Sequence, residues 1–282
     1  MKSFSQILRA TVKYPLVQLL ECAPLRRRII FELRQRHYGD LETVISLGGG
    51  LQCPVCFWEA WASFSHIFFE QEYAKAFQIM PAPARWIDLG SYAGYFSLYL
   101  ACLRQQRNLP LTFQALLVDA DSRCAAAAEK IRQLNGWTGQ MEFCRGLIGP
   151  SEGEHAFVER SYMTSSARSD DPAPGRVLMV PRISASELMR RLPPPYDLIK
   201  ADIEGGEYHL LTQYQPLLRE TEYFLLEWHS WHPGGGGQAQ LRKMTEDAGF
   251  EICQITLAPG DAAHRSGERQ SGVHLYRRKA SR

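Results

Sequence analysis

The feature that most constrains the fold is a regular alternation of apolar, strand-like segments with helical segments, which begins at Arg85. Alternation of this kind is typical of an α/β sheet whose parallel strands are joined by crossover helices. The segments predicted as strands are 85–89, 113–118, 141–145, 196–201, 223–227, 251–257 and 272–277. Helices are predicted between them, near 94–106, 122–135, 184–192, 205–219 and 237–248.

The last two predicted strands are joined by a loop, with no helical segment between them. Parallel neighbours need a long crossover connection, so this link predicts a last strand that runs antiparallel to the others. We therefore predict an α/β, Rossmann-like sheet of seven strands, mostly parallel, with the last strand antiparallel. The polar, turn-rich segment 149–176 is interpreted as a long loop or flap beside the ligand-binding edge.

The residues before this alternation follow a different pattern. We divide the chain into an N-terminal helical extension with a short strand pair, residues 1–80, and an α/β domain, residues 81–282. The elements predicted in the extension are one or two helices over 1–38, strands at 43–45 and 51–53 around a glycine turn, and a helix over 59–77 before the Pro81–Pro83 linker.

Composition narrows the class of protein. The net charge of +2 over 282 residues gives no sign of a nucleic-acid partner. Seven cysteines, scattered through apolar segments, fit a reducing compartment, and the close pair Cys53 and Cys56 lacks the further ligands of a zinc site. We read no signal peptide and no run of 18 apolar residues, and therefore expect a cytoplasmic protein.

The charge is unevenly distributed along the chain. Eight basic and three acidic residues give the first forty residues a charge of +5, which leaves −3 for the rest. This basic, partly apolar extension suits three roles: a lid packed on the α/β domain, half of a homodimer interface, or weak docking on an anionic surface at the inner membrane. Glu21 and Pro24 interrupt its apolar stripe, so packing is the preferred prediction.

Residues 86–101, WIDLGSYAGYFSLYLA, combine an apolar strand, a glycine-containing turn and an apolar helix. Such a turn lies at the carboxyl end of its strand, where open α/β sheets bind ligands. Gly90 permits close approach of the backbone to a ligand, and Gly94 permits close packing of the helix. The acid at the strand end suits the ammonium group of S-adenosylmethionine better than a pyrophosphate. The residues predicted to form this cofactor turn are Asp88, Gly90, Ser91, Tyr92 and Gly94.

A second acid follows the next predicted strand. In the segment ALLVDAD, Asp119 lies at the strand end, with Ala120 and Asp121 after it. A carboxylate at this position can accept hydrogen bonds from both hydroxyl groups of a ribose. The alternative is a helix cap, a role that suits Asp121. We predict that Asp119 and Ala120 contact the cofactor.

A third acidic group follows the fourth predicted strand in YDLIKADIEGGEYHLL, residues 196–211. Asp202 and Glu204 would face the same cleft as the first turn, because the carboxyl ends of parallel strands share one edge of the sheet. Charges gathered at one edge are costly unless they bind something. The alternative is that one of these acids caps the following helix. We predict that both line the reaction cleft and that Asp202 also contacts the cofactor.

These blocks, with the segment FLLEWH, resemble successive blocks of the FkbM family over roughly residues 70–255. The most distinctive block is the segment Lys200–Glu207, KADIEGGE. The resemblance implies a Rossmann-like class I methyltransferase that uses S-adenosylmethionine and acts mainly on hydroxyl groups. It also implies that Glu72 or Tyr73 closes over the cofactor. Tyr92 departs from the family, which usually carries glycine or asparagine there.

The implied reaction is O-methylation of a hydroxyl on a sugar, a glycan or another secondary metabolite. A hydroxyl nucleophile must lose a proton, so a general base is expected. The residues proposed as catalytic are Asp202, Glu204 and His229, with Glu227 as a further candidate base; His229 has the ordinary pKa nearest neutrality. Two alternatives stay open. One is a divalent-cation-dependent O-methyltransferase with Asp202, Glu204, Glu227 and either His229 or His232 as ligands. The other is a non-catalytic scaffold protein.

Overall fold

The computed structural model describes residues 43–57, 59–149, 151–160, 175–229, 237–257 and 271–280. The chain divides into two compact units, residues 1–43 with 56–58 and residues 44–55 with 59–282. The predicted helices of residues 1–38 lie outside the described residues, and the fold below is that of the second unit. The division that we place between residues 80 and 81 stays a prediction.

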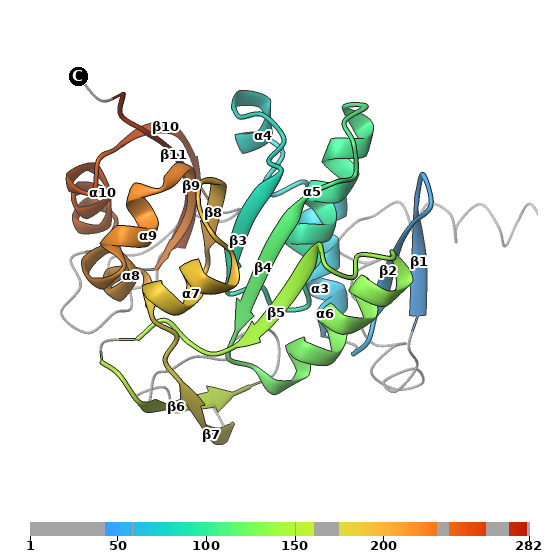
Figure 1. Ribbon diagram of the computed structural model, residues 1–282, viewed down its shortest axis with the longest axis horizontal. Coiled ribbons are helices and arrows are strands. Elements are labelled where there is room, and N and C mark those ends of the chain that lie inside the picture. Colours follow the sequence, from blue (N-terminus) through green and yellow to red (C-terminus); the bar gives the residue numbers. More distant parts are fainter. Residues whose placement is uncertain are drawn as a thin grey trace, which may run out of the picture. The chain divides into compact units, whose positions relative to one another are not determined.

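Seven strands form one sheet in the order β10-β11-β9-β8-β3-β4-β5 (Figure 1). The last strand, β11, pairs antiparallel with both of its neighbours, and the other pairings are parallel. The predicted Rossmann-like sheet, mostly parallel with an antiparallel last strand, is therefore confirmed. Its strands are β3 Arg85–Leu89, β4 Gln114–Asp119, β5 Met141–Arg145, β8 Tyr196–Ala201, β9 Thr221–His229, β10 Phe250–Leu257 and β11 Ser271–Arg278.

Helices flank the sheet as the alternating pattern predicts. Figure 1 shows α5 and α6 beside the β3–β5 half, and α8, α9 and α10 beside the β8–β11 half. The helices are α5 Tyr95–Gln106, α6 Ser122–Leu134, α7 Ala185–Arg191, α8 Glu207–Gln213, α9 Gln215–Arg219 and α10 Gly237–Asp247. Residues 205–219 form two helices instead of the predicted one, because Pro216 can occupy only the first turn of a helix and starts α9 there. No helix among the described residues is long and apolar enough to cross a bilayer.

The strand order reverses between β3 and β8. From β3 the chain proceeds to β4 and β5 on one side, and then returns to place β8 on the other side of β3. Both strands are almost completely buried, which matches their apolar sequences. Ligands bind beyond the carboxyl ends of the strands at such a reversal, so the topology marks the end of β3 and β8 as the place to look for a site.

The segment before the sheet differs from its prediction. The strand pair is confirmed as β1 Thr43–Gly48 and β2 Leu51–Val55. The single helix predicted over 59–77 is instead divided into α3 Ala60–Phe64, the π-helical turn η1 Ser65–Phe69 and α4 Ala76–Ile79. The π-helical turn ends where Glu70 N donates to Ser65 O, and Gln71 then takes a left-handed φ of 56°, which an α-helix cannot contain.

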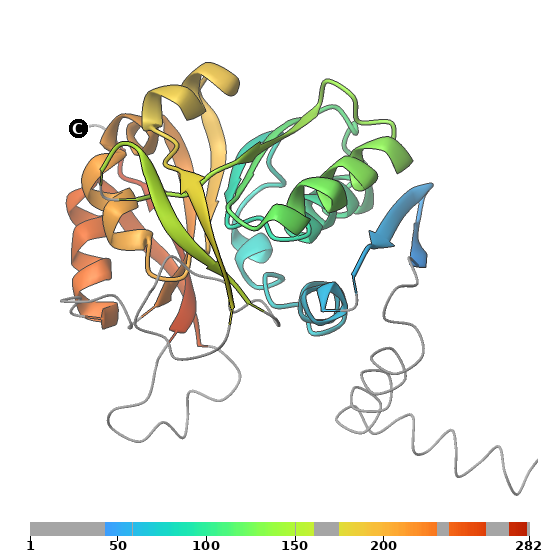
Figure 2. The same ribbon diagram turned by 90° about the horizontal axis from the view of Figure 1, so that it is seen from below.

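The predicted loop 149–176 contains a two-stranded ribbon in its described part. β6 Glu154–Glu159 pairs antiparallel with β7 Arg176–Pro181, and the ribbon lies by the end of the sheet toward which β4 and β5 point (Figures 1 and 2). One face of the ribbon is apolar: Phe157 and Val180 pack with Ala120 and Leu147. In its described part the segment thus contains a short paired ribbon and not a loop throughout, and the apolar face of this ribbon is completed by residues outside the segment.

The close approach of the β3–α5 turn to the end of β8 makes a testable prediction. A Cβ at Gly90 would overlap the backbone oxygen of Asp202, and the φ of Gly90 is 71°. Gly136 has a similar φ of 66° but open space around it. We expect Gly136→Ala to cost about 1–2 kcal/mol of unfolding free energy through its left-handed conformation.

For Gly90→Ala we expect a further loss of about 1–3 kcal/mol, because the clash with Asp202 adds to the same conformational cost. Urea unfolding of both variants at one pH gives the comparison. Equal losses in the two variants would contradict the tight contact between the two strand ends.

Candidate functional site

The first predicted turn lies at the end of β3, next to the ends of β4 and β8. Backbone N–H groups of Gly90 and Ser91 donate to Val118 O at 2.9 and 3.1 Å, which ties the turn to β4. Gly94 is the N-cap of α5 with a φ of 80°, and a Cβ there would press on Leu117 at 3.1 Å. The close packing of the helix at Gly94 is as predicted, and the approach of the Gly90 backbone to a ligand stays a prediction.

Asp88 does not face the cleft. Its side chain is fully buried, and Oδ2 accepts a hydrogen bond from Ser97 Oγ at 3.1 Å. The other oxygen lies 3.6 Å from the ammonium of Lys200, which is its register partner on β8. Burial raises the pKa of Asp88, while Lys200 and Ser97 act against that rise. Asp88 therefore supports the turn from inside the sheet, and this geometry does not support a direct contact with a cofactor ammonium.

Asp119, at the end of β4, joins the first turn to the second. Its Oδ2 accepts from Tyr92 N at 2.7 Å, and its Oδ1 accepts from Asp121 N at 2.9 Å. Burial raises the pKa of Asp119 to about 6, and the two backbone hydrogen bonds oppose that rise. Asp121 is the N-cap of α6 and also binds Arg123, as the capping alternative predicts. The two acids thus have different roles: Asp121 caps α6, and Asp119 places its carboxylate at the end of β4.

Two smaller residues complete this part of the site. Ser91 is 4% exposed, and its Oγ has no hydrogen-bond partner in the described part of the chain. Buried hydroxyls are normally hydrogen-bonded, so such an atom beside a turn indicates a polar ligand. Ala120 is buried against the β6–β7 ribbon, which forms an apolar wall next to Asp119. Tyr92 takes a φ of 46°, the left-handed conformation that glycine or asparagine adopts more easily.

Asp202 and Glu204 follow β8 in the short connection to α8. Asp202 N donates to Leu89 O at 3.0 Å, which places this connection beside the first turn. Glu204 takes a φ of 51°, a strained conformation that is often found at functional sites. The N-cap of α8 is Gly206, and no side chain caps the helix. The capping alternative is therefore wrong for both acids, and each side chain is about three-tenths exposed.

His229 is the last residue of β9, and its side chain is 3% exposed. Its Nδ1 lies 2.7 Å from Glu207 Oε1, while Nε2 lies 3.8 Å from Asp202 Oδ1 and 4.0 Å from Glu204 Oε2. Burial alone would lower the pKa of His229, but the charge and hydrogen bond of Glu207, with Glu204 and Asp202, raise it to about 10. These surroundings thus favour the protonated form of His229, which argues against the predicted role as general base.

Three further residues act electrostatically with Asp202: Glu72, Tyr73 and Glu227. Burial and the charge of Asp202 raise the pKa of Glu72 to about 7. Burial and the charges of Asp202 and Glu72 raise the pKa of Glu227 well above its usual range. Tyr73 is buried against Phe96, and the charges of Glu72 and Glu227 act on its hydroxyl. The structure therefore brings residues 72 and 73 to the predicted cleft, where an excess of carboxylates favours a cationic ligand.

Asp202, Glu227 and His229 also offer three ligand atoms within 4.8 Å of one another, the grouping that could hold a metal ion. A cation here would compete with the proton on His229, whose charged form Glu207 stabilises.

The sequence predictions missed two buried residues of this site. Lys200 donates to Gly90 O at 2.8 Å and lies 3.4 Å from Asp202 Oδ2. Glu207 is the fully buried partner of His229. A signal existed for the first, because Lys200 is a charged residue in the buried part of a mainly apolar strand, where an unpaired charge is costly.

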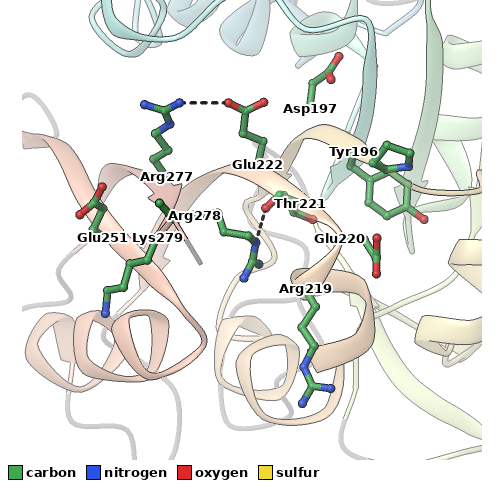
Figure 3. A pocket seen from close by; sticks show the side chains of 12 residues that line it. Tyr196, Asp197, Arg219, Glu220, Thr221, Glu222, Glu251, Arg277, Arg278 and Lys279 are labelled. Atoms are coloured by element: carbon green, nitrogen blue, oxygen red, sulfur yellow. Dashed lines mark hydrogen bonds and ion pairs between the residues drawn. The ribbon is translucent and has the colours of Figure 1, made fainter. Parts of the chain in front are cut away.

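A hollow of about 570 Å³ lies at the opposite end of β8 and β9 (Figure 3). It is lined by four basic side chains and four acidic ones, and Figure 3 shows the pair Arg277 and Glu222 together. Arg278 donates to Thr221 O at 2.8 Å. The hollow thus has equal numbers of acidic and basic side chains, and one of the basic ones is bound to the backbone. None of the predicted site residues lines it.

The buried ammonium of Lys200 makes a testable prediction. Lys200→Met leaves Asp88 buried without its cation, and breaking a buried pair in this way costs about 3–5 kcal/mol. We expect Asp88→Asn in the same chain to recover most of that loss, because no charge then remains unpaired. Guanidinium unfolding at pH 7 measures both effects.

The control is Lys243→Met, whose side chain is 74% exposed on α10; an exposed pair contributes about 1 kcal/mol or less. A Lys200→Met protein as stable as this control would show that the ammonium does not hold the two strand ends.

No family model matches this chain. Over 86 residues it is 36% identical to human transmembrane O-methyltransferase, a segment that covers 30% of this chain and 27% of that protein. Over 60 residues it is 45% identical to the mouse transmembrane O-methyltransferase homolog, 21% of each chain. The matches thus span about a fifth to a quarter of these relatives' length.

Solved structures with a similar arrangement include the Synechocystis magnesium protoporphyrin IX methyltransferase with bound SAM. It has 13% identity and a TM-score of 0.46, over 89% of this chain and 96% of that chain. Another is a putative O-methyltransferase from Klebsiella pneumoniae, with 16% identity and a TM-score of 0.41, over 90% and 89%. The assignment to the methyltransferase variant of the Rossmann-like fold rests on the strand order itself, and the FkbM resemblance stays a prediction.

Proposed function

We propose that this chain is an S-adenosylmethionine-dependent methyltransferase that methylates a hydroxyl group. The observation that carries the proposal is the position of Asp119. Its carboxylate is fixed by the backbone N–H groups of Tyr92 and Asp121, at the meeting point of the first turn and the second strand. Its ionised form would accept hydrogen bonds from the two ribose hydroxyls of the cofactor.

The surrounding residues fit the other parts of the cofactor. The orphaned Oγ of Ser91 offers a hydrogen bond next to the turn. The carboxylates of Glu72, Asp202 and Glu227, whose charges act on one another, would favour the cationic methionine end. Ala120 and the apolar face of the β6–β7 ribbon form a wall beside Asp119 that suits a flat base.

When bound, this cofactor supplies an already activated methyl group. The residues then have to exclude water and hold an acceptor oxygen in line with the methyl, at about 3–3.5 Å. The acceptor must also give up its proton. Because the surroundings of His229 favour its protonated form and Asp202 lies beside the ammonium of Lys200, we assign the general base to Glu204.

An acceptor such as a sugar, a glycan or another secondary-metabolite hydroxyl is suggested by the FkbM resemblance of KADIEGGE, residues 200–207. The O-methyltransferase names of the curated relatives support a hydroxyl acceptor of some kind. Docking on a membrane and formation of a homodimer would use the N-terminal extension. Both stay predictions, as does the cytoplasmic location.

The divalent-cation-dependent alternative is favoured by the grouping of Asp202, Glu227 and His229. A chelator distinguishes it from the metal-independent reaction. If methyl transfer persists after extensive treatment with EDTA, the cation is not needed; if transfer stops and returns with Mg²⁺, this alternative holds.

The cofactor assignment predicts the effect of Asp119→Ala. Loss of a charged acceptor for two hydroxyls should weaken binding of S-adenosylhomocysteine by about 1.5–3 kcal/mol, or about ten- to a hundredfold. Calorimetry measures it at pH 7.5, where the pKa of about 6 leaves the wild-type carboxylate ionised.

Asp121→Ala is the matched control, since it removes a carboxylate two residues away that caps α6. It should lower the unfolding free energy by about 1 kcal/mol through the lost cap and leave the affinity for S-adenosylhomocysteine nearly unchanged. Equal affinities in wild type and Asp119→Ala would show that the ribose does not bind there.

The assignment of the base predicts that Glu204→Gln cuts turnover by about 10²–10⁴ while binding of S-adenosylhomocysteine changes little. Transfer of a labelled methyl group to a mixture of hydroxyl acceptors gives turnover, and calorimetry gives the affinity. Glu246→Gln, which removes an exposed carboxylate on α10, is the control. Small and equal losses in turnover and affinity would make Glu204 structural, and cofactor binding without any transfer would favour the scaffold alternative.

A further inference from the structure

The buried contact between Glu207 and His229 is not used by any role assigned above. Glu207 is the first residue of α8 and is 0% exposed. A carboxylate so deeply buried is costly unless it is paired. Its Oε1 accepts from Ile203 N at 3.2 Å and lies 2.7 Å from His229 Nδ1. Among the described residues its Oε2 has no hydrogen-bond partner. The contacts that offset the cost of burying this carboxylate are therefore made by Oε1 alone.

This contact fixes the direction of the His229 ring. With Nδ1 on Glu207, the opposite nitrogen, Nε2, is turned toward Asp202 Oδ1 and Glu204 Oε2, at 3.8 and 4.0 Å. The two ring nitrogens have separate tasks in such an arrangement, and the partner of one sets the position of the other. Glu207 thus acts from inside the protein on the same two carboxylates that line the cleft.

The charges around the ring favour its protonated form. Glu207 faces it from α8, Asp202 and Glu204 face it from the β8–α8 connection, and the charge of Glu227 on β9 acts on it as well. Among the described groups near it, Lys200 is a cation that also contacts Asp202. A cationic ring in this position attracts both carboxylates and limits where they can point.

We propose that Glu207 is a positioning residue, which holds the His229 ring so that its Nε2 side keeps the Asp202 and Glu204 carboxylates directed into the cleft. The role in catalysis rests on the proposed function, with Glu204 as the base. The contact itself is independent of that function. In this role Glu207 acts on the two carboxylates through His229, and its Oε1 also holds the backbone between them at Ile203 N.

Acting through His229 has a measurable consequence. Glu207→Gln keeps a side-chain oxygen that can accept from Ile203 N, so this replacement should add nothing once His229 has been replaced. The variants are therefore Glu207→Gln, His229→Asn and the double replacement. The double variant carries no buried charge at this position, so it can fold even if Glu207→Gln, with an unpaired imidazolium, does not.

The first readout needs no cofactor. The side-chain ¹⁵N resonances of His229 and the carboxyl ¹³C resonances of Asp202 and Glu204 are recorded against pH. In the wild type we expect His229 to stay protonated through pH 8, in line with the pKa of about 10. In Glu207→Gln it should lose its proton near neutral pH, and the carboxyl resonances should move in the same direction as in His229→Asn. If the carboxyl resonances of Asp202 and Glu204 do not move in either variant, the proposal is overturned.

The second readout is turnover with labelled S-adenosylmethionine and a hydroxyl acceptor. We expect Glu207→Gln to lower kcat at least tenfold with less than a threefold change in the affinity for S-adenosylhomocysteine. The double variant should be no slower than His229→Asn alone. Additive losses would show a route that bypasses His229, and they would refute the positioning role.

Glu187→Gln is the matched control for a purely structural effect. Glu187 is also a first-turn glutamate, on α7, so it reports the cost of losing a charge near a helix start. It should leave all resonances of the cleft and kcat unchanged. If wild-type protein fails to bind S-adenosylhomocysteine, the proposed function fails, while the resonances still decide whether Glu207 positions His229.

Discussion

The carboxyl end of the sheet depends on one buried cation. Lys200 lies opposite Asp88 in the β3–β8 pairing, and its ammonium donates to Gly90 O and contacts Asp202. Burial would lower its pKa, but Asp202 and Asp88 raise it above the ordinary value. This charge holds the turn after β3 against the connection after β8. Without it, Asp88 near the end of β3 and Asp202 after β8 would repel one another.

Around this cation the chain gathers more negative than positive charge. Glu72, the neighbouring Asp202 and Glu204, and Glu227 come from three segments, and the surroundings of His229 favour a second cation among them. Burial raises the pKa values of Glu72 and Glu227, and the charge of Asp202 adds to the rise in both. A ligand that brings positive charge would relieve the repulsion, whereas a pyrophosphate would increase it. The same crowding explains why His229 is held protonated and why a carboxylate is the better candidate for the base.

Much of the fold could be predicted, because the central strands are apolar runs bounded by turns. β3 has the predicted bounds of Arg85–Leu89, and the acids Asp119 and Asp202 lie at strand ends, as their positions in the sequence indicate. The pairings between distant segments could not be predicted. Glu207 and His229 are 22 residues apart, and their contact depends on how α8 packs on β9. The burial of Asp88 depends on the register with β8, which sequence periodicity does not contain.

The central claim is that the strand ends at the switch between β3 and β8 form the site of S-adenosylmethionine. A crystal structure of the protein grown with S-adenosylhomocysteine tests it most directly. The account predicts ribose hydroxyls within hydrogen-bonding distance of the Asp119 carboxylate, and the amino acid end beside Ser91 and the acids after β8. Failure of the ligand to bind, or a ribose bound away from Asp119, would contradict it.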